Sequence, residues 1–313
     1  MKTQTLEEKR ATRRIYGAAF RRRRGIAVTT RGSSTKSEVE ARQAALYTIV
    51  ELQKPMTVRQ VFYRAMVALI VVKTEGGYDI VQNNLVKMRR SGTLPYGWIT
   101  DSTRRRMITG TWDSPAQAIE DWAERYRRSA LRDSGVHIEI WIEKDALSGV
   151  LWPIVAPYDV PLMVARGYSS VTFLYESAEY MKAIGCPCYI YQLGDHDPSG
   201  ANAGVVIERT LRELAPGVEI HFERLAVLPW QIEEWKLPTR PTKKTDPRAK
   251  NFVGDSVELD AIEPDQLRQI VLDAIEQHIS PNDVRVLRAA EESERLLING
   301  LVGMLPAAEE EEE

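Results

Sequence analysis

Three carboxylates occupy positions typical of a cation site. Glu143 follows the apolar stretch 136–142, and Asp195 and Asp197 follow the apolar stretch 187–193. The carboxyl ends of parallel strands meet at one edge of a sheet, and alternation along an extended chain puts both aspartates on one side. Crowded carboxylates repel one another unless a cation joins them. Such hard oxygen ligands suit Mg²⁺, with Mn²⁺ as an alternative.

The segment around these acids alternates short apolar runs with helical patterns. Strands are expected at 136–142, 160–165, 187–193 and 218–227, with helices at 145–156, 169–183 and 199–214. This βαβαβαβ order is typical of an α/β fold with a parallel sheet covered by helices. An amphipathic helical segment is expected after it, at about 257–305.

The region before the sheet has the pattern of a helix-turn-helix unit. Ser37 with Glu40, and Thr57 with Gln60, form capping-box patterns that predict two helix starts. Helices are expected from Ser37 to Pro55, from Thr57 to about Ile70, at 78–90 and at 115–131, with a β-wing at 93–106. The pattern favours a DNA-binding winged helix. The alternative is a helical bundle with a solvated basic face.

The charges of the chain are segregated although they nearly cancel. The 313 residues carry a formal net charge of −2. Residues 1–132 hold 26 Lys and Arg against 12 Asp and Glu, whereas the remainder hold 16 against 32. The basic half predicts a polyanion as partner, here double-stranded DNA. Expected contacts with the DNA backbone are Lys87, Arg89, Arg90, Arg104, Arg105 and Arg106.

Several other classes of protein are disfavoured. The longest purely apolar run, 66–72, is far shorter than the roughly 20 residues that cross a bilayer, and the N-terminus lacks the apolar segment of a signal peptide. A cytoplasmic protein without membrane contact is therefore expected. Cys186 and Cys188 are the two cysteines, too few for a zinc site of their own.

The acidic motifs resemble those of a known family. WIEKDAL (141–147) and GDHDPSG (194–200) resemble the Toprim signature, in the form found in the A subunit of DNA topoisomerase VI and the meiotic double-strand-break transesterase. TVRQVFYR (57–64) resembles the nucleophile motif of that family, whose second tyrosine falls on Tyr63. VELDAI (257–262) resembles its Leu-Asp-Ala element.

The whole chain most resembles the short, solitary topoisomerase Mini-A proteins of bacterial mobile elements and phages. One departure is Phe62, which replaces the first tyrosine of the family's pair. The resemblance implies an α/β multidomain protein, with a winged-helix domain followed by a Toprim Rossmann-like domain with a C-terminal helical elaboration. The match runs in order from about residue 57 to 275, and the expected divisions are the winged helix at 37–133 and the Toprim domain at 134–306. A basic arm at 1–36 and an acidic tail at 307–313 are expected from composition and have no counterpart in the family.

The function that the resemblance implies is a metal-dependent, type IIB topoisomerase-like DNA transesterase that acts without ATP by itself. Tyr63 would attack a phosphodiester, with Arg59 as a neighbouring cation one helical turn away. Glu143, Asp195 and Asp197 would bind the metal, and Glu143 is alternatively a general acid or base. The family also implies a homodimer that makes double-strand breaks at the nucleoid, and leaves an ATPase B-type subunit open as a partner.

Two other functions stay open from the sequence. One is a Toprim nuclease that uses water and needs no tyrosine. The other is a DNA-binding or regulatory protein whose catalytic centre is idle, which would bind DNA with a steep salt dependence.

Overall fold

A single parallel sheet forms the centre of the molecule. The computed structural model describes residues 35–100, 109–132, 134–167, 169–242, 252 and 254–302. The sheet has four strands in the order β2-β1-β3-β4, and all pairs are parallel. The strands are β1 (His137–Ile142), β2 (Leu162–Val164), β3 (Cys188–Leu193) and β4 (Ile220–Ala226). The α/β fold class is therefore confirmed.

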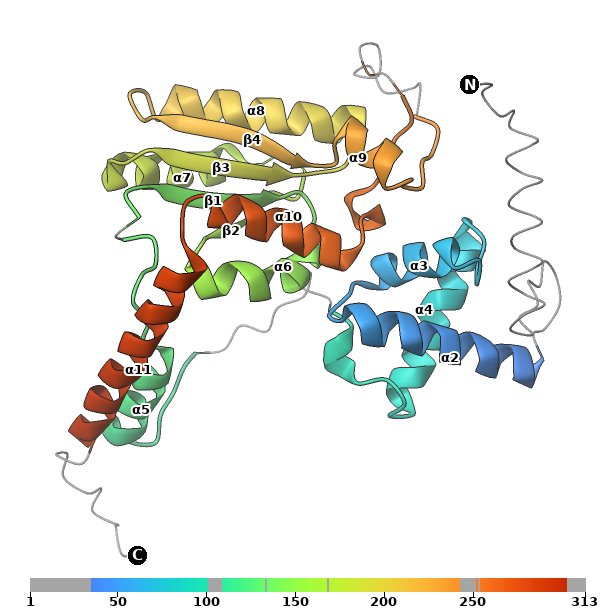
Figure 1. Cartoon of the computed structure of the whole chain (residues 1–313), viewed down its shortest axis with the longest axis horizontal. Coiled ribbons are helices and arrows are strands. Elements are labelled where there is room, and N and C mark those ends of the chain that lie inside the picture. The colour runs from blue at the N-terminus through green and yellow to red at the C-terminus, as the bar shows by residue number, and fades with distance from the viewer. Residues whose placement is uncertain are drawn as a thin grey trace, which may run out of the picture.

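Helices cover both faces of this sheet (Figure 1). They are α6 (Ser148–Val155) and α10 (Pro264–Glu276) on one face, and α7 (Val171–Ile184) and α8 (Pro198–Leu214) on the other. Strand β1 is buried along its whole length, and its alternate residues enter different cores. Ile140 lies in the core on the α6 side, whereas Trp141 lies in the core on the α7 side.

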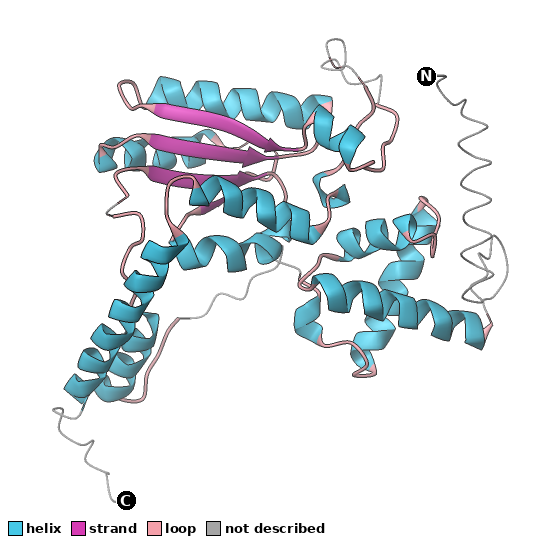
Figure 2. Cartoon of the chain, viewed as in Figure 1, coloured by secondary structure: helices cyan, strands magenta, loops and turns pink. Residues whose placement is uncertain are grey.

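The described N-terminal part, residues 35–100, consists of helices and loops. Figure 2 shows that the strands lie in the part of the molecule that contains the sheet. The helices of the N-terminal part are α2 (Lys36–Gln53), α3 (Val58–Val67) and α4 (Glu75–Arg90). The capping box of α3 is confirmed, since Thr57 and Gln60 exchange hydrogen bonds with each other's backbone. The expected cap of α2 is wrong, because Thr35 with Glu38 forms the capping box two residues earlier.

The expected wing is not seen in its described part. Residues 93–100 form a 3₁₀ turn at Tyr96–Trp98 and a single bridge between Met56 and Ile99. The rest of the segment, including Arg104, Arg105 and Arg106, lies outside the described residues.

Helix α5 (Pro115–Arg125) ends six residues earlier than expected and packs against α11 (Pro281–Val302). The side chain of Glu291 on α11 is 2% exposed and binds the segment that follows α5. It accepts from the Arg127 side chain at 3.2 Å and from the Arg128 N–H at 3.1 Å. Contacts to the buried carboxylate of Glu291 thus hold α11 against the segment that follows α5.

The remaining elements differ little from expectation. A short helix, α9 (Pro229–Glu234), follows β4. Three 3₁₀ turns are also present: η2 (Asp145–Leu147), η3 (Ala156–Tyr158) and η5 (Leu259–Ala261). No helix in the described ranges is both long enough and apolar enough to cross a membrane.

Candidate functional site

Glu143 and Asp195 meet at the carboxyl edge of the sheet. Strands β1 and β3 pair in register up to Ile142 and Leu193, so the residues that follow emerge side by side. The Asp195 N–H donates to the Glu143 carboxylate, Oε2, at 2.9 Å. The expectation that these strand ends bring the two acids together is confirmed by this contact.

Two glycines of the GDHDPSG segment make room for the Glu143 carboxylate. A Cβ atom on Gly194 would lie 2.9 Å from Glu143 Oε2, and one on Gly200 would lie 3.0 Å from the same oxygen. The Gly200 position would also place its Cβ 2.4 Å from the Asp195 backbone oxygen. Only residues without a side chain allow these backbones to approach the acid so closely.

Asp197 lies near this pair but is directed into a helix cap. Its Oδ1 accepts from the Gly200 N–H at 2.8 Å, which makes Asp197 the N-cap of α8. Its Oδ2 lies 3.4 Å from the Arg240 guanidinium. Asp197 nevertheless contributes to the electrostatics of the site, since its charge helps to raise the pKa of Glu143.

The acids fit a hard cation in donor type and charge. Burial, together with the charge of Asp195, raises the pKa of Glu143 above its ordinary value, and burial likewise raises the pKa of Asp195. A bound dication would offset this repulsion. Among the described residues, however, no three His, Cys, Asp or Glu side chains are already arranged around one point as a metal site.

Lys144 is the cation that occupies the centre of the site. Its ammonium lies 2.8 Å from Asp260 Oδ2, 3.0 Å from Asp195 Oδ1 and 3.5 Å from Glu258 Oε2. Burial would lower the pKa of Lys144, but the three carboxylates outweigh burial and raise it. The ammonium therefore stays charged and joins the strand-end acids to the 257–262 segment.

Tyr63 is buried beside this cluster. Only 5% of the residue is exposed, and its ring packs against Phe62 at 5.5 Å between centroids. Burial, and next the charge of Glu258, raise the pKa of the phenol, while Lys144 and Arg59 act in the opposite direction. The hydroxyl is therefore a covered neutral phenol in this conformation, close to the cations that could stabilise its anion.

Arg59 is tied to a carboxylate of the C-terminal half. Its Nη1 lies 2.6 Å from Glu258 Oε2, and its side chain is 48% exposed. Burial would raise the pKa of Glu258, but Lys144 and Arg59 outweigh it and hold the pKa below its ordinary value. Arg59 thus lies near Tyr63, as expected, but its guanidinium forms an ion pair with Glu258.

Further contacts dock α3 on η5. The Thr57 hydroxyl donates to Asp260 Oδ1 at 3.1 Å, and Arg64 donates to the Ala261 carbonyl at 2.7 Å and pairs with Glu263. The resemblance marks both segments separately, but only the fold places them against each other. Sequence reasoning did not predict that Glu258 and Asp260 pair with Lys144 and with α3. Their spacing of two residues within VELDAI, which places both acids on one side of an extended segment, could have indicated this.

Arg224 is a second residue that sequence reasoning misses. From β4 it donates to the carbonyls of Gly194 at 2.9 Å, Asp195 at 2.7 Å and Gly200 at 3.0 Å. Burial lowers the pKa of Arg224, which the charges of Glu143 and Asp195 offset only in part. Arg224 thereby fixes the backbone of the acidic loop. No sequence signal marks it, because an arginine on an edge strand usually faces solvent.

The expected DNA contacts on α4 cluster at its C-terminal end. Lys87 and Arg90 are exposed and Arg89 is partly exposed, all in the last turn of the helix. The cations there also complement the negative end of the helix dipole.

The chain was compared with known protein families and with curated proteins. No family model matches it, and no curated protein matches it.

Proposed function

We propose that this protein is a DNA-cleaving transesterase of the type IIB topoisomerase kind, with a helical DNA-binding unit of winged-helix type and a Toprim-like sheet domain. The observation that carries the proposal is the position of Lys144. It pairs with Asp195 on one side and with Glu258 and Asp260 on the other, and those two acids adjoin Tyr63. A strand-end acid pair and a tyrosine are therefore parts of one electrostatic cluster.

The proposed reaction exchanges one phosphoester for another. The Tyr63 oxygen attacks a DNA phosphorus atom, a tyrosyl–phosphate bond forms, and the bond from phosphorus to one deoxyribose oxygen breaks. The phenol loses its proton and the leaving oxygen gains one. Glu143, whose pKa is raised without a metal, would carry this proton as the alternative to its role as a metal ligand. Because the ester energy is retained, the reverse attack reseals the strand.

The other groups have positioning roles in this proposal. Glu143, Asp195 and Asp197 would hold Mg²⁺ or Mn²⁺, which supplies charge stabilisation at the reacting phosphate. Lys144 and Arg59 would stabilise the phenolate after release from their carboxylate partners. The cations at the end of α4 would hold the DNA backbone, and two copies of the chain would cut the two strands.

Trapping of protein-linked DNA tests the proposal. Supercoiled plasmid is incubated with the full chain and Mg²⁺ or Mn²⁺, quenched in detergent, and examined for protein attached to cut ends before and after protease. Covalent ends are expected for the wild type, and none for Tyr63→Phe. Tyr78→Phe, a partly buried tyrosine on α4 that packs on Phe62, is the matched control.

The burial of Tyr63 favours one second candidate, a metal-dependent nuclease that uses water. A phenol that is 5% exposed must be uncovered before it can reach DNA, whereas Glu143 and Asp197 are already partly exposed at the strand ends. Cleavage that persists in Tyr63→Phe and leaves no protein on the ends would identify the nuclease. Salt-sensitive DNA binding without cleavage in either metal would indicate a DNA-binding protein with an idle centre.

A further inference from the structure

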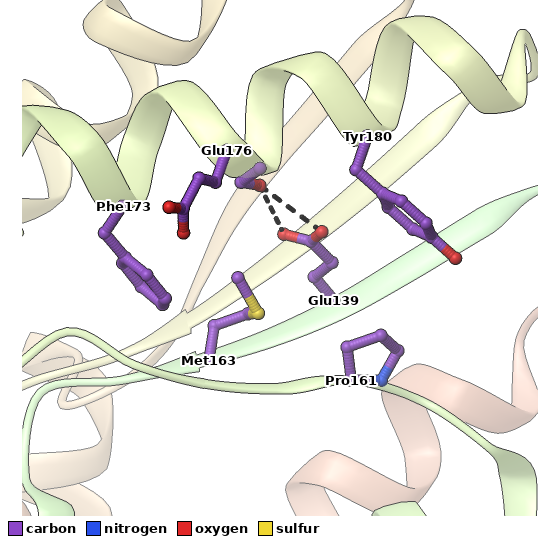
Figure 3. Close-up of a pocket in the computed structure, with 7 residues that line it drawn as sticks. Glu139, Pro161, Met163, Phe173, Glu176 and Tyr180 are labelled. Carbon is purple, nitrogen blue, oxygen red and sulfur yellow. Dashed lines mark hydrogen bonds between the residues drawn. The ribbon is translucent and has the colours of Figure 1, made fainter.

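A cavity of about 230 Å³ lies between α7 and the edge formed by β1 and β2, apart from the acidic cluster (Figure 3). Its lining comprises Glu139, Pro161, Met163, Phe173, Glu176, Ser177 and Tyr180. A cavity of about 150 Å³ lined by apolar side chains holds benzene, so this volume accommodates a ligand of one-ring size.

The cavity combines apolar walls with a carboxylate at its base. The side chains of Phe173 and Tyr180 stand at opposite ends, and the Met163 sulfur points towards Glu139 from the opposite side to α7 (Figure 3). Glu139 is only 2% exposed, while Glu176 stands exposed on α7 at the rim. Aromatic faces attract organic cations, and methionine adapts to irregular ligands.

The bonding of Glu139 leaves capacity for another donor. Its carboxylate accepts from Trp141 Nε1 at 2.7 Å, from the Ser177 hydroxyl at 3.2 Å and 3.4 Å, and lies 3.1 Å from His137 Nε2. A carboxylate offers roughly four acceptor positions. The two Ser177 distances belong to one hydroxyl with one proton, so Trp141, Ser177 and His137 together use three of these positions. Within the described ranges, no Lys or Arg side chain pairs with Glu139. The cavity thus holds two carboxylates without a permanent cation.

We propose that this cavity binds a small organic cation that carries N–H donors on a flat or short apolar body, such as an amidinium or a guanidinium group. One donor would take the remaining acceptor position of Glu139, Phe173 and Tyr180 would contact the apolar body, and Glu176 would attract the charge at the entrance. The same chemistry is present in a free small molecule and in an arginine side chain of a protein partner. The proposal does not depend on the proposed DNA cleavage.

Methyl NMR of the full chain tests the proposal, with the Met163 methyl as reporter and its signal assigned through Met163→Leu. Benzamidine is the cationic probe and benzamide its neutral counterpart. Benzamidine is expected to shift the Met163 signal saturably, with an affinity about tenfold higher than that of benzamide, because benzamide keeps N–H donors but lacks the positive charge that strengthens their hydrogen bonds to a carboxylate. N-acetylarginine amide is a third probe, which represents the arginine side chain of a protein partner.

Variants locate the effect. Glu139→Gln should lower benzamidine affinity by about tenfold, and Glu176→Gln by a smaller factor, with a smaller effect of each on benzamide. Glu179→Gln, an exposed acid on the same helix outside the cavity, should change neither. Glu176→Gln keeps the test valid if Glu139→Gln fails to fold, since its side chain is on the surface.

Equal or tighter binding of N-acetylarginine amide would support the proposal and indicate a protein side chain as ligand, whereas preference for benzamidine would support it and indicate a free molecule. The proposal is overturned if no probe shifts Met163 at about 10 mM. It is also overturned if benzamide binds as well as benzamidine, or if both Glu139→Gln and Glu176→Gln leave benzamidine affinity unchanged.

Discussion

Arg59 and Glu258 lie 199 positions apart in the chain, yet the guanidinium donates to the carboxylate at 2.6 Å. This contact joins the helix that carries Tyr63 to the segment that adjoins the strand-end acids. It helps to keep Tyr63 covered, so the strength of the α3–η5 docking governs access to the tyrosine.

The first prediction concerns this docking. Glu258→Gln should weaken the α3–η5 contact by about 1 kcal/mol, a modest value because Arg59 is half exposed and solvent screens the pair. Amide hydrogen exchange of residues 58–67 should become several-fold faster than in the wild type. Glu234→Gln on α9 is the control. Unchanged exchange in α3 would mean that Glu258 does not hold the helix.

Lys144→Met is the second change. Removal of the ammonium leaves Asp195, Glu258 and Asp260 without their shared cation, and the melting temperature should fall. Because a cation would again relieve the repulsion, Mg²⁺ should raise the melting temperature of the variant more than that of the wild type. Lys182→Met, which removes an exposed pair with Glu179, is the control. An equal response to Mg²⁺ in both proteins contradicts the expectation.

A third prediction follows from the space around Glu143. Gly200→Ala would place a Cβ 2.4 Å from the Asp195 backbone oxygen, so the acidic loop must move. The cost should be about 2 kcal/mol in the free energy of unfolding, and metal-dependent cleavage should be lost. Gly76→Ala has no atom within 4 Å of the added Cβ and should retain both properties. Chemical denaturation and the plasmid assay provide the measurements.

These acids also show where sequence reasoning succeeded and where it stopped. Strand-end placement predicted the meeting of Glu143 and Asp195, because the register of parallel strands is local and regular. Asp197 was expected beside them as a third ligand, and its ligand role stays a prediction. Its Oδ1 caps α8, a second role that its position before Pro198 also favours and that the sequence reasoning had not assigned. The strands and most helices were likewise predictable from periodicity.

The cluster around Tyr63 could not be predicted in the same way. Lys144 meets Glu258 and Asp260 only when the loop after β1 packs against residues 258–260, and Thr57 reaches Asp260 only when the helical unit docks there. No periodicity encodes such contacts. The expected extent of α5 was also wrong. Its continuation past Arg125 gives way to an irregular segment, in which the Arg128 N–H and the Arg127 guanidinium bind Glu291.

The fourth prediction concerns DNA binding. Lys87 and Arg90 are exposed at the end of α4, so the double variant Lys87→Ala/Arg90→Ala should weaken binding of duplexes of any sequence. Each phosphate contact contributes about 0.9 to the slope of log K against log salt, and the slope should therefore fall by about 2. Lys182→Ala on α7 should leave it unchanged. An unaltered slope in the double variant would exclude this end of α4 from the interface.

The fifth prediction is a pH dependence of the α5–α11 contact. Burial would raise the pKa of Glu291, but the Arg128 N–H and Arg288 outweigh it and lower the pKa. Because the pKa of Glu291 is lower in the folded state, its ionised carboxylate stabilises the protein at pH values above the unfolded pKa of about 4.3. This stabilisation is lost as the pH falls through the folded pKa.

Glu291→Gln should therefore lower the free energy of unfolding by about 3 kcal/mol near neutral pH, and by progressively less as the pH falls from about 4.3 through the folded pKa of Glu291. Glu292→Gln, whose side chain is exposed, is the matched control. Denaturation curves between these pH values test the expectation, and a difference that is constant with pH would contradict it.

The long separation between α3 and η5 has a consequence for biosynthesis. The ribosome releases the Tyr63 helix early, but its cover at 258–263 emerges only after about two hundred further residues. At an elongation rate of about 5–20 residues per second, the apolar side of α3 that faces η5 stays uncovered for roughly 10–40 seconds. The growing chain therefore presents its tyrosine before its acids exist, and the covered arrangement forms only after residues 258–263 have emerged from the ribosome.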